Sequence, residues 1–304
     1  MSIARAAEIL RSGGLVVFPT ETVYGLGADA VNPRAVARIY EAKGRPQFNP
    51  LIAHVSGLTE AERHAHLHEN ARRLARAFWP GPFTIVARRR SESPVAELAC
   101  AGLDTIALRA PSHPMARELL SAFGGPIVAP SANRSGHVSA TTAQHAAEDL
   151  GDRVDLVLDG GPCQIGLEST IVAVGEDGAV ALLRPGAISR GEIEAIVGPV
   201  SSAHAAKVQA PGMLESHYAP RARIRLDAAA PQPGEAYLAF GAPAPAGGAT
   251  LSASGDLVEA AANLYATLRA LDATGADVIA VAPIPPHGLG EAIRDRLARA
   301  AAPR

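Results

Sequence analysis

The sequence predicts an α/β protein made of two domains, and three features of the chain support this prediction. Its 304 residues, 48% of them apolar, exceed what one hydrophobic core usually holds. Short apolar runs typical of buried strands alternate with segments whose apolar residues recur at helical spacing. Residues 201–221 show neither the apolar pattern of a strand nor the spacing of a helix. We therefore expect a linker there, between a domain over 1–200 and a smaller α/β domain over 222–304.

Helices of the first domain are predicted where a capping residue precedes a run with helical periodicity. The first covers residues 2–11, and the second starts at Asn32-Pro33, where asparagine can cap and proline suits the first turn. The same pattern predicts helices at 69–78, 114–123 and 142–150. A last helix follows Ser189, which has capping-box spacing to Glu192.

Strands are predicted at short apolar runs bounded by turn residues. In the first domain these runs lie at 15–18, 51–55, 83–88, 105–109, 126–129, 155–158, 169–174 and 180–183. In the second domain we expect strands at 224–226, 236–240 and 277–281, with helices at 257–271 and 288–301. Strands and helices mixed in this order are typical of an α/β fold.

The charge balance excludes a protein that stays bound to nucleic acid. The chain has 28 Lys+Arg against 30 Asp+Glu and a net charge of −2, whereas lasting nucleic-acid binding depends on cations that neutralise phosphates. Transient contact with RNA stays open. Only two of the cations, Lys43 and Lys207, are lysines, which marks Lys43 as a position where arginine does not suffice.

The cysteines and the absence of long apolar stretches predict the compartment. Cys100 and Cys163 match no metal spacing and form no disulfide framework, so we expect free thiols in a reducing compartment. No leader pattern and no stretch of about 18 apolar residues is present. We therefore expect a soluble, cytoplasmic protein without membrane contact.

Polar segments that follow apolar strands are the candidate binding segments. The chain lacks the phosphate-loop and GxGxxG patterns, and it also lacks GxSxG, HExxH and CxxC. In α/β proteins ligands usually bind where strands end. The segments in such positions are residues 19–27, 43–50, 129–136 and 159–170.

Two of these segments carry groups suited to an anionic ligand. Lys43 and Arg45 flank a glycine, so side chains and backbone can both approach phosphate oxygens. Ser131 lies in a segment rich in short donors and acceptors, but no context marks it or Cys163 as a nucleophile. We predict no metal site, because residues 64–68, with three histidines, fall in a predicted surface helix.

Taken together, these segments resemble the YrdC-like family of threonylcarbamoyl-AMP synthases in its longer two-domain form. The matching stretches, in chain order, are FPTETVYGLGADA, KGRPQFNPLIAHV, WPGPFTIV, TIALRAPSHP, PIVAPSANRSG, DGGPCQIGLESTIV, LRPGAI, HYAP, LYATLRALD and GLGEAIRDRLARAA. They span nearly the whole chain, and ten stretches in the same order make chance implausible.

The resemblance implies a fold and a reaction. It implies a twisted mixed sheet around a large, concave, positively charged cavity, with a Rossmann-like C-terminal domain and a linker that covers the site. The implied enzyme is a nucleotidyltransferase that makes threonylcarbamoyl-AMP, pyrophosphate and water from L-threonine, bicarbonate and ATP, with magnesium. The product would pass to a threonylcarbamoyl transferase complex and tRNA, which it contacts transiently.

The resemblance also assigns residues by position. Those expected around threonine are Thr22, His54, Arg109, Ser131 and Ser169. Those expected around ATP are Arg45, Asn49, Thr105, Asn133, Thr141, Arg184 and Tyr218. Lys43 would face the phosphates, and Lys43 and Arg45 are the expected catalytic residues. ATP carries about four negative charges, which these cations and a magnesium ion would balance.

The expected lid, residues 210–220, departs from the family pattern. Many members carry basic residues where this chain has Leu214-Glu215-Ser216, which leaves His217, Tyr218 and Arg221 to close the site. Two alternatives stay open: a double-stranded-RNA or tRNA-binding module, and an enzyme that forms a carbamoyl-adenylate.

Overall fold

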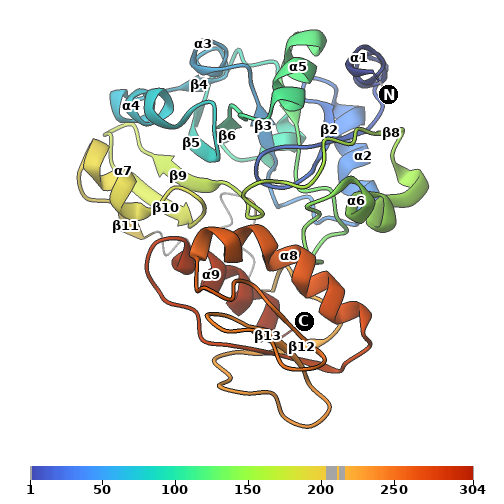
Figure 1. Ribbon diagram of the computed structural model, residues 1–304. Helices are drawn as coiled ribbons and strands as arrows, with labels where there is room; N and C mark the ends of the chain where they lie inside the picture. Colours follow the sequence, from blue (N-terminus) through green and yellow to red (C-terminus); the bar gives the residue numbers. More distant parts are fainter. Residues whose placement is uncertain (1, 203–210, 212–215, 304) are drawn as a thin grey trace.

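Two sheets organise the chain. The computed structural model describes residues 2–202, 211 and 216–303, and Figure 1 shows a larger unit above a smaller one. The larger sheet is mixed, whereas all strand pairs of the smaller sheet are parallel. The predicted α/β class is therefore confirmed, while the boundaries at 200 and 222 stay predictions.

The larger sheet has eleven strands in the order β11-β10-β9-β5-β6-β3-β7-β2-β1-β8, with β4 paired to β5. In chain order they are β1 (Val16–Phe18), β2 (Gly25–Asp29), β3 (Ile52–His54), β4 (Ala65–His66), β5 (Phe83–Arg89), β6 (Thr105–Arg109), β7 (Ile127–Val128), β8 (Leu156–Val157), β9 (Thr170–Val174), β10 (Val180–Arg184) and β11 (Ser201–Ser202). All eight predicted strands are present. β2, β4 and β11 were not predicted, and β11 lies inside the predicted linker.

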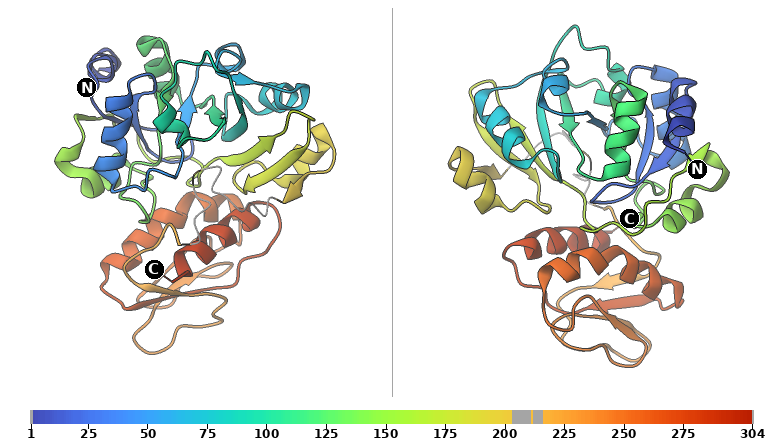
Figure 2. Two further views of the ribbon diagram at one scale, coloured as in Figure 1. Left: turned by 180° about the vertical axis from the view of Figure 1, so that it is seen from behind. Right: turned by 45° about the horizontal axis from the view of Figure 1, so that its top comes forward.

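Helices cover the larger sheet on both faces, as Figures 1 and 2 show. They are α1 (Ile3–Arg11), α2 (Pro33–Lys43), α3 (Leu58–Ala61), α4 (Glu69–Phe78), α5 (Pro114–Phe123), α6 (Ala143–Leu150) and α7 (Arg190–Val197), with 3-10 turns at Glu97–Cys100 and Gly151–Arg153. Successive residues of β1 enter different cores, because side chains alternate along a strand. Val17 packs with the α2 side, whereas Val16 and Phe18 pack with α1 and α5.

One prediction about helices was wrong. The histidine segment is not a helix: His64 lies in a turn, His66 in β4, and His68 caps α4 by accepting a hydrogen bond from the Asn70 backbone N–H at 3.1 Å. Alternating polar and apolar residues there suit a short edge strand. Among the described residues no group of three or more potential ligands could hold a metal ion.

The smaller unit has a four-stranded sheet in the order β12-β15-β13-β14. Its elements are β12 (Arg223–Arg225), β13 (Ala236–Ala239), β14 (Gly248–Thr250), α8 (Leu257–Ala273), β15 (Val278–Val281) and α9 (Leu289–Ala301); β14 was not predicted. Both helices lie between this sheet and the larger unit (Figures 1 and 2). Its core continues into Val23, Val138 and Leu167 of the larger unit, so an apolar interface joins the two.

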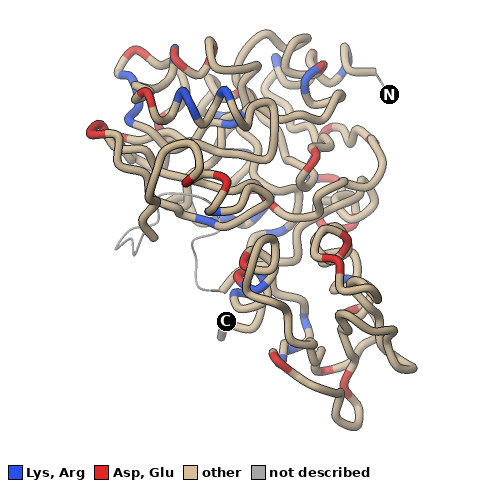
Figure 3. The backbone as a smooth tube through the Cα atoms, turned by 60° about the vertical axis from the view of Figure 1, so that its left-hand side comes forward, with Lys and Arg blue, Asp and Glu red and all other residues tan. Residues whose placement is uncertain are grey.

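Only part of the expected lid is described. Pro211 and residues 216–221 are described, whereas Leu214 and Glu215 lie outside the described residues. The side chain of Arg221 is exposed and pairs with Asp272 at 3.4 Å. Within the described ranges no helix is long and apolar enough to cross a membrane. Acidic and basic residues are spread over both units (Figure 3).

Candidate functional site

A polar cavity lies between the larger sheet and the linker. The residues that line it come from strand ends and from the predicted polar segments: Thr22, Val23, Arg45, Ile52, His54, Arg109, Ala129, Pro130, Ser131, Glu168, Ser169, Arg184, Pro211, His217 and Tyr218. Its volume is about 40 Å³, enough for a water molecule or two. The cavity is thus much smaller than the resemblance implies, and three linker residues form part of its wall.

The sheet places the first pair of cavity residues side by side. His54 and Arg109 end the neighbouring parallel strands β3 and β6 and are partners in register. Ile52 and Ala107 share their face of the sheet and pack in a small separate cluster, not in the main core. Because side chains alternate along a strand, both polar side chains emerge on this same, cavity-bearing face.

Arg109 is held by a buried carboxylate that the sequence had not singled out. Arg109 Nη2 donates to Glu21 Oε1 at 2.7 Å, and both side chains are 5% exposed. Glu21 Oε2 also accepts the backbone N–H groups of Ser112 and His113, at 3.1 and 3.3 Å. Burial alone would raise the pKa of Glu21, but the charge and hydrogen bond of Arg109 lower it below its usual value.

The two cavity histidines are neutral. Burial, with a smaller contribution from Arg109, lowers the pKa of His54 to about 3. Burial together with the charge of Arg45 lowers the pKa of His217 to about 3. The Nδ1 atoms of both rings have no hydrogen-bond partner among the described residues. Each ring therefore offers the cavity an uncharged nitrogen that a ligand can satisfy.

Arginines form the opposite wall. Pairing between β10 and β9 shifts between Leu182 and Arg184, and this bulge accompanies the turn of Arg184 into the cavity. Arg184 donates to the Ser169 carbonyl from Nε at 3.1 Å and from Nη2 at 2.9 Å. Arg45 donates to the carbonyls of Asn49 and Pro50 at 3.2 and 2.9 Å. Burial lowers the pKa of Arg45 to about 10, so it stays charged at neutral pH.

A second buried carboxylate, Glu168, joins the cavity to the smaller unit. It accepts hydrogen bonds from Ser139 Oγ at 2.5 Å, Tyr265 Oη at 2.8 Å and Arg296 Nε at 2.8 Å. Tyr265 lies in α8 and Arg296 in α9, so both donors cross the interface. Burial would raise the pKa of Glu168, but Arg296 and Arg184 bring it to about 2. Arg296 lies within the apolar stripe of α9, an unusual place for an arginine, but its spacing along the chain does not identify Glu168 as its partner.

Tyr218 reaches the cavity from the linker, as predicted for a lid residue. Its φ of 62° is in the left-handed region, which is uncommon for a tyrosine. The ring stacks on Tyr265 with centroids 5.8 Å apart, and the Arg296 guanidinium lies 5.2 Å from its centre. Tyr218 Oη is buried without a partner among the described residues. Tyr218 thus brings an uncommon backbone conformation and a buried hydroxyl without a described partner to the cavity wall.

Five predicted residues do not line the cavity: Lys43, Asn49, Thr105, Asn133 and Thr141. The Lys43 ammonium instead donates to the Ser131 carbonyl at 2.6 Å and to that of Asn133. Thr105 begins β6, and Thr141 lies 3.4 Å from a nitrogen of His145. The buried amides of Asn49 and Asn133 retain unpartnered atoms.

Comparisons with known proteins show which family this chain is similar to. A family model of the Sua5, YciO and YrdC proteins, described as telomere recombination, matches residues 8–186, and the threonylcarbamoyl-AMP synthase C-terminal domain matches 188–302. The chain is 40% identical to threonylcarbamoyl-AMP synthase of Bacillus subtilis (99% of this chain, 93% of the relative) and 41% identical to that of Pyrococcus abyssi (97% and 92%). The structure of P. abyssi Sua5 complexed with L-threonine has a TM-score of 0.92 at 38% identity and covers 98% of this chain and 94% of that chain.

Proposed function

The chain belongs to the Sua5/YciO/YrdC family, and we propose that it is an L-threonylcarbamoyladenylate synthase: it converts L-threonine, bicarbonate and ATP into threonylcarbamoyl-AMP, pyrophosphate and water. The observation that carries this proposal is the cavity itself. Three arginines that line it are combined with hydroxyl and imidazole groups. Such a set suits an amino acid beside a nucleotide, and the solved relative holds L-threonine.

For threonine, Arg109 is the proposed partner of the carboxylate. Its guanidinium has five N–H donors, of which one reaches Glu21 and another, Nε, the Gly81 carbonyl at 3.3 Å. The remaining donors are available to the substrate. Thr22, Ser131 and Ser169 supply hydroxyls for its amine and side chain, and His54 supplies an uncharged ring nitrogen.

For ATP, Arg45 and Arg184 are the proposed phosphate partners, and Tyr218 covers the nucleotide from the linker. Asn49, Thr105, Asn133 and Thr141 do not line the cavity in the described structure but complete the proposed set. We propose that Lys43 is a positioning residue that does not contact the phosphates itself. Its side chain donates hydrogen bonds to the carbonyls of Ser131 and Asn133 and so fixes the loop between them.

The chemistry needs no nucleophile from the protein. The threonine amine attacks the bicarbonate carbon and water leaves, which forms a carbamate. A carbamate oxygen then attacks the α-phosphorus of ATP, and the bond to pyrophosphate breaks. The protein contributes positioning and charge stabilisation, which dominate phosphoryl-group chemistry. Carbamates decompose in water, so a closed cavity also protects the intermediate.

Magnesium fits this proposal as a companion of ATP. It usually binds through substrate phosphates and water with one or two carboxylates at most. Glu168 is the one carboxylate in the described cavity wall, and its oxygens already accept bonds from Ser139, Tyr265 and Arg296. The ion would therefore be held mainly by the phosphates, whose charge it offsets.

We further propose that the product passes to a threonylcarbamoyl transferase complex, which modifies tRNA, and that the enzyme works in the cytoplasm. Support for this location comes from Cys100 and Cys163, which are both buried free thiols, as is usual in a reducing compartment.

Pyrophosphate release tests the proposed activity. The protein should release pyrophosphate only when ATP, L-threonine and bicarbonate are all present. Release that ignores threonine would contradict the proposal and favour an adenylating enzyme of another kind. RNA binding that falls steeply with salt, without any pyrophosphate release, would favour the RNA-binding alternative.

A further inference from the structure

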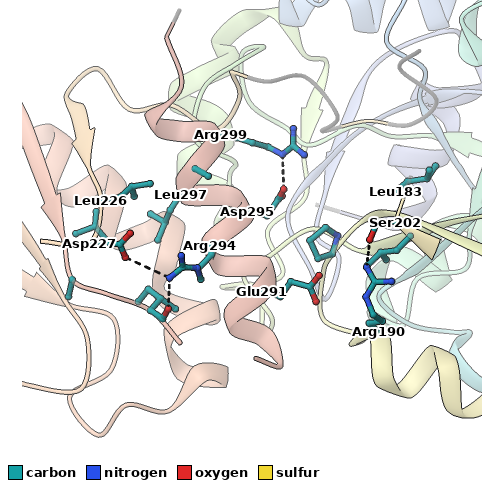
Figure 4. A pocket seen from close by; sticks show the side chains of 16 residues that line it. Leu183, Arg190, Ser202, Leu226, Asp227, Glu291, Arg294, Asp295, Leu297 and Arg299 are labelled. Atoms are coloured by element: carbon teal, nitrogen blue, oxygen red, sulfur yellow. Dashed lines mark hydrogen bonds and ion pairs between the residues drawn. The ribbon is translucent and has the colours of Figure 1, made fainter. Parts of the chain in front are cut away.

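A second cavity lies between the two units, apart from the catalytic cavity. Its volume is about 450 Å³. Figure 4 shows one wall formed by α9 and the ends of β12 and β15, and an opposite wall formed by β10 and Arg190 of α7. Arg184, one residue past Leu183 in this wall, belongs to the catalytic cavity instead. The end of β10 thus separates the two cavities.

The second cavity occupies the ligand-binding position of a parallel sheet. Asp227 follows β12, and residues 281–284 lie at the end of β15, which pairs with β12 in parallel. Ligands of α/β folds bind at this carboxyl edge. Asp227 has a φ of 53°, a left-handed conformation that costs free energy in a non-glycine residue. Its carboxylate is only loosely engaged, 3.7 Å from Arg294.

The walls combine three kinds of surface. Leu226 and Leu297 provide an apolar floor. Glu291 points across the cavity from α9 (Figure 4), and its carboxylate makes no hydrogen bond or ion pair to another described residue. Arg190 faces it from the larger unit and donates to Val200 O at 2.7 Å and Ser202 Oγ at 3.0 Å, which leaves further guanidinium donors unused.

We propose that this cavity is a second, non-catalytic nucleotide site that takes a nucleoside monophosphate. The apolar floor would receive the base. Asp227 and Glu291 would accept hydrogen bonds from the ribose hydroxyls, a role that acidic side chains at strand ends have in dinucleotide-binding sheets. Arg190 would receive the phosphate. The volume falls within the 300–1,000 Å³ typical of small-ligand sites.

A nucleotide bound here would touch both units at once, because Arg190 belongs to the larger unit and the two carboxylates to the smaller one. Ligands that bind only the folded state raise its stability. Occupancy of this cavity should therefore raise the temperature at which the units separate and unfold.

Binding of AMP to the full-length protein tests this site, with the AMP bound measured by equilibrium dialysis and the unfolding temperature by scanning calorimetry. The catalytic cavity also recognises nucleotides under the proposed function, so two kinds of variant separate the sites. Arg45→Ala disables the catalytic cavity, and the double variant Asp227→Asn/Glu291→Gln disables the second one. Glu118→Gln, an exposed residue of α5, is the matched control.

We expect one equivalent of AMP, with its rise in unfolding temperature, to persist in Arg45→Ala and Glu118→Gln and to disappear in the double variant. The double variant should keep its pyrophosphate release, which shows that it folds and leaves the proposed activity as a separate question. The site is excluded if all AMP binding disappears in Arg45→Ala, or if the double variant binds as much AMP as the unchanged protein. Binding of inorganic phosphate with equal affinity would also overturn it, since that identifies a simple anion site.

Discussion

Two buried arginine–glutamate pairs border the proposed catalytic cavity, and they have different origins. Arg109 and Glu21 both belong to the larger unit, and their closest atoms are 2.7 Å apart. Arg296 belongs to the smaller unit, and its closest distance to Glu168 of the larger unit is 2.8 Å. All four side chains are less than 10% exposed. The Arg109–Glu21 pair thus stabilises the site within the larger unit, whereas the Arg296–Glu168 pair joins the smaller unit to it.

The difference shows what the smaller unit contributes. Strand register fixes Arg109, whereas the second pair forms only when α9 is docked on the larger unit. The same Arg296 guanidinium lies over the ring of Tyr218. The smaller unit therefore holds one cavity carboxylate and the linker tyrosine together.

The largest expected effect is on stability, from Arg296→Met. The substitution leaves Glu168 charged and buried without its partner, which costs about 3–5 kcal/mol. The free energy of unfolding, measured by urea denaturation, should fall by that amount. The double variant Arg296→Met/Glu168→Gln should recover part of the loss, because it removes the unpaired charge. Equal stability of single variant and unchanged protein would show that the pair does not join the units.

The second effect distinguishes the roles of Glu21 and Glu168 by the substrate whose KM changes. Glu21→Gln removes the charged partner that positions Arg109. We therefore expect the KM for threonine to rise about tenfold, equivalent to about 1.4 kcal/mol, with little change in the KM for ATP. Glu168→Gln serves as the comparison, since its carboxylate does not touch Arg109. A similar change in threonine KM for both variants would contradict separate roles.

The sequence predicts neither pair, although it predicts the strand that carries Arg109. The strand at 105–109 and the capping box at Ser189 are found as predicted, because local apolar patterns and capping determine them. β2 was missed because its glycines hide the strand pattern. A Cβ on Gly27 would lie 2.8 Å from the Phe18 ring, so close packing requires glycine there. Contacts such as Glu168–Arg296 depend on domain docking, which spacing along the chain does not encode.

A third effect concerns Tyr218, whose hydroxyl is unpartnered in the closed cavity. Tyr218→Phe removes no bond present in this state, so stability should change little. If the hydroxyl binds the nucleotide, the KM for ATP should rise by about 2- to 12-fold, the equivalent of a hydrogen bond worth about 0.5–1.5 kcal/mol. Tyr265→Phe is a suitable control, because its hydroxyl bonds to Glu168 at 2.8 Å and not to substrate. An unchanged KM for ATP in Tyr218→Phe would remove this residue from the nucleotide site.

The last expected effect is a pH dependence of stability. His54 and His217 have pKa values of about 3 in the folded protein but about 6.5 when unfolded. Between these values the unfolded chain binds more protons, so stability falls as pH decreases from 6.5 toward 3. Below about pH 4.5, protonation of Glu168 adds to the loss, since its folded pKa is about 2. His54→Gln should flatten the decline by about 1.4 kcal/mol per pH unit; an unaltered slope would mean that His54 is charged when folded.

Mass spectrometry of the product tests the central claim most directly. The unchanged protein, supplied with ATP, ¹³C-bicarbonate and ¹⁵N-threonine, should form one AMP conjugate that carries both labels, in equal amount to the pyrophosphate released. Arg109→Met should form far less of it at the same threonine concentration. A conjugate that carries ¹³C without ¹⁵N would show that threonine is not joined to the bicarbonate carbon, and pyrophosphate without any labelled conjugate would contradict the proposed reaction altogether.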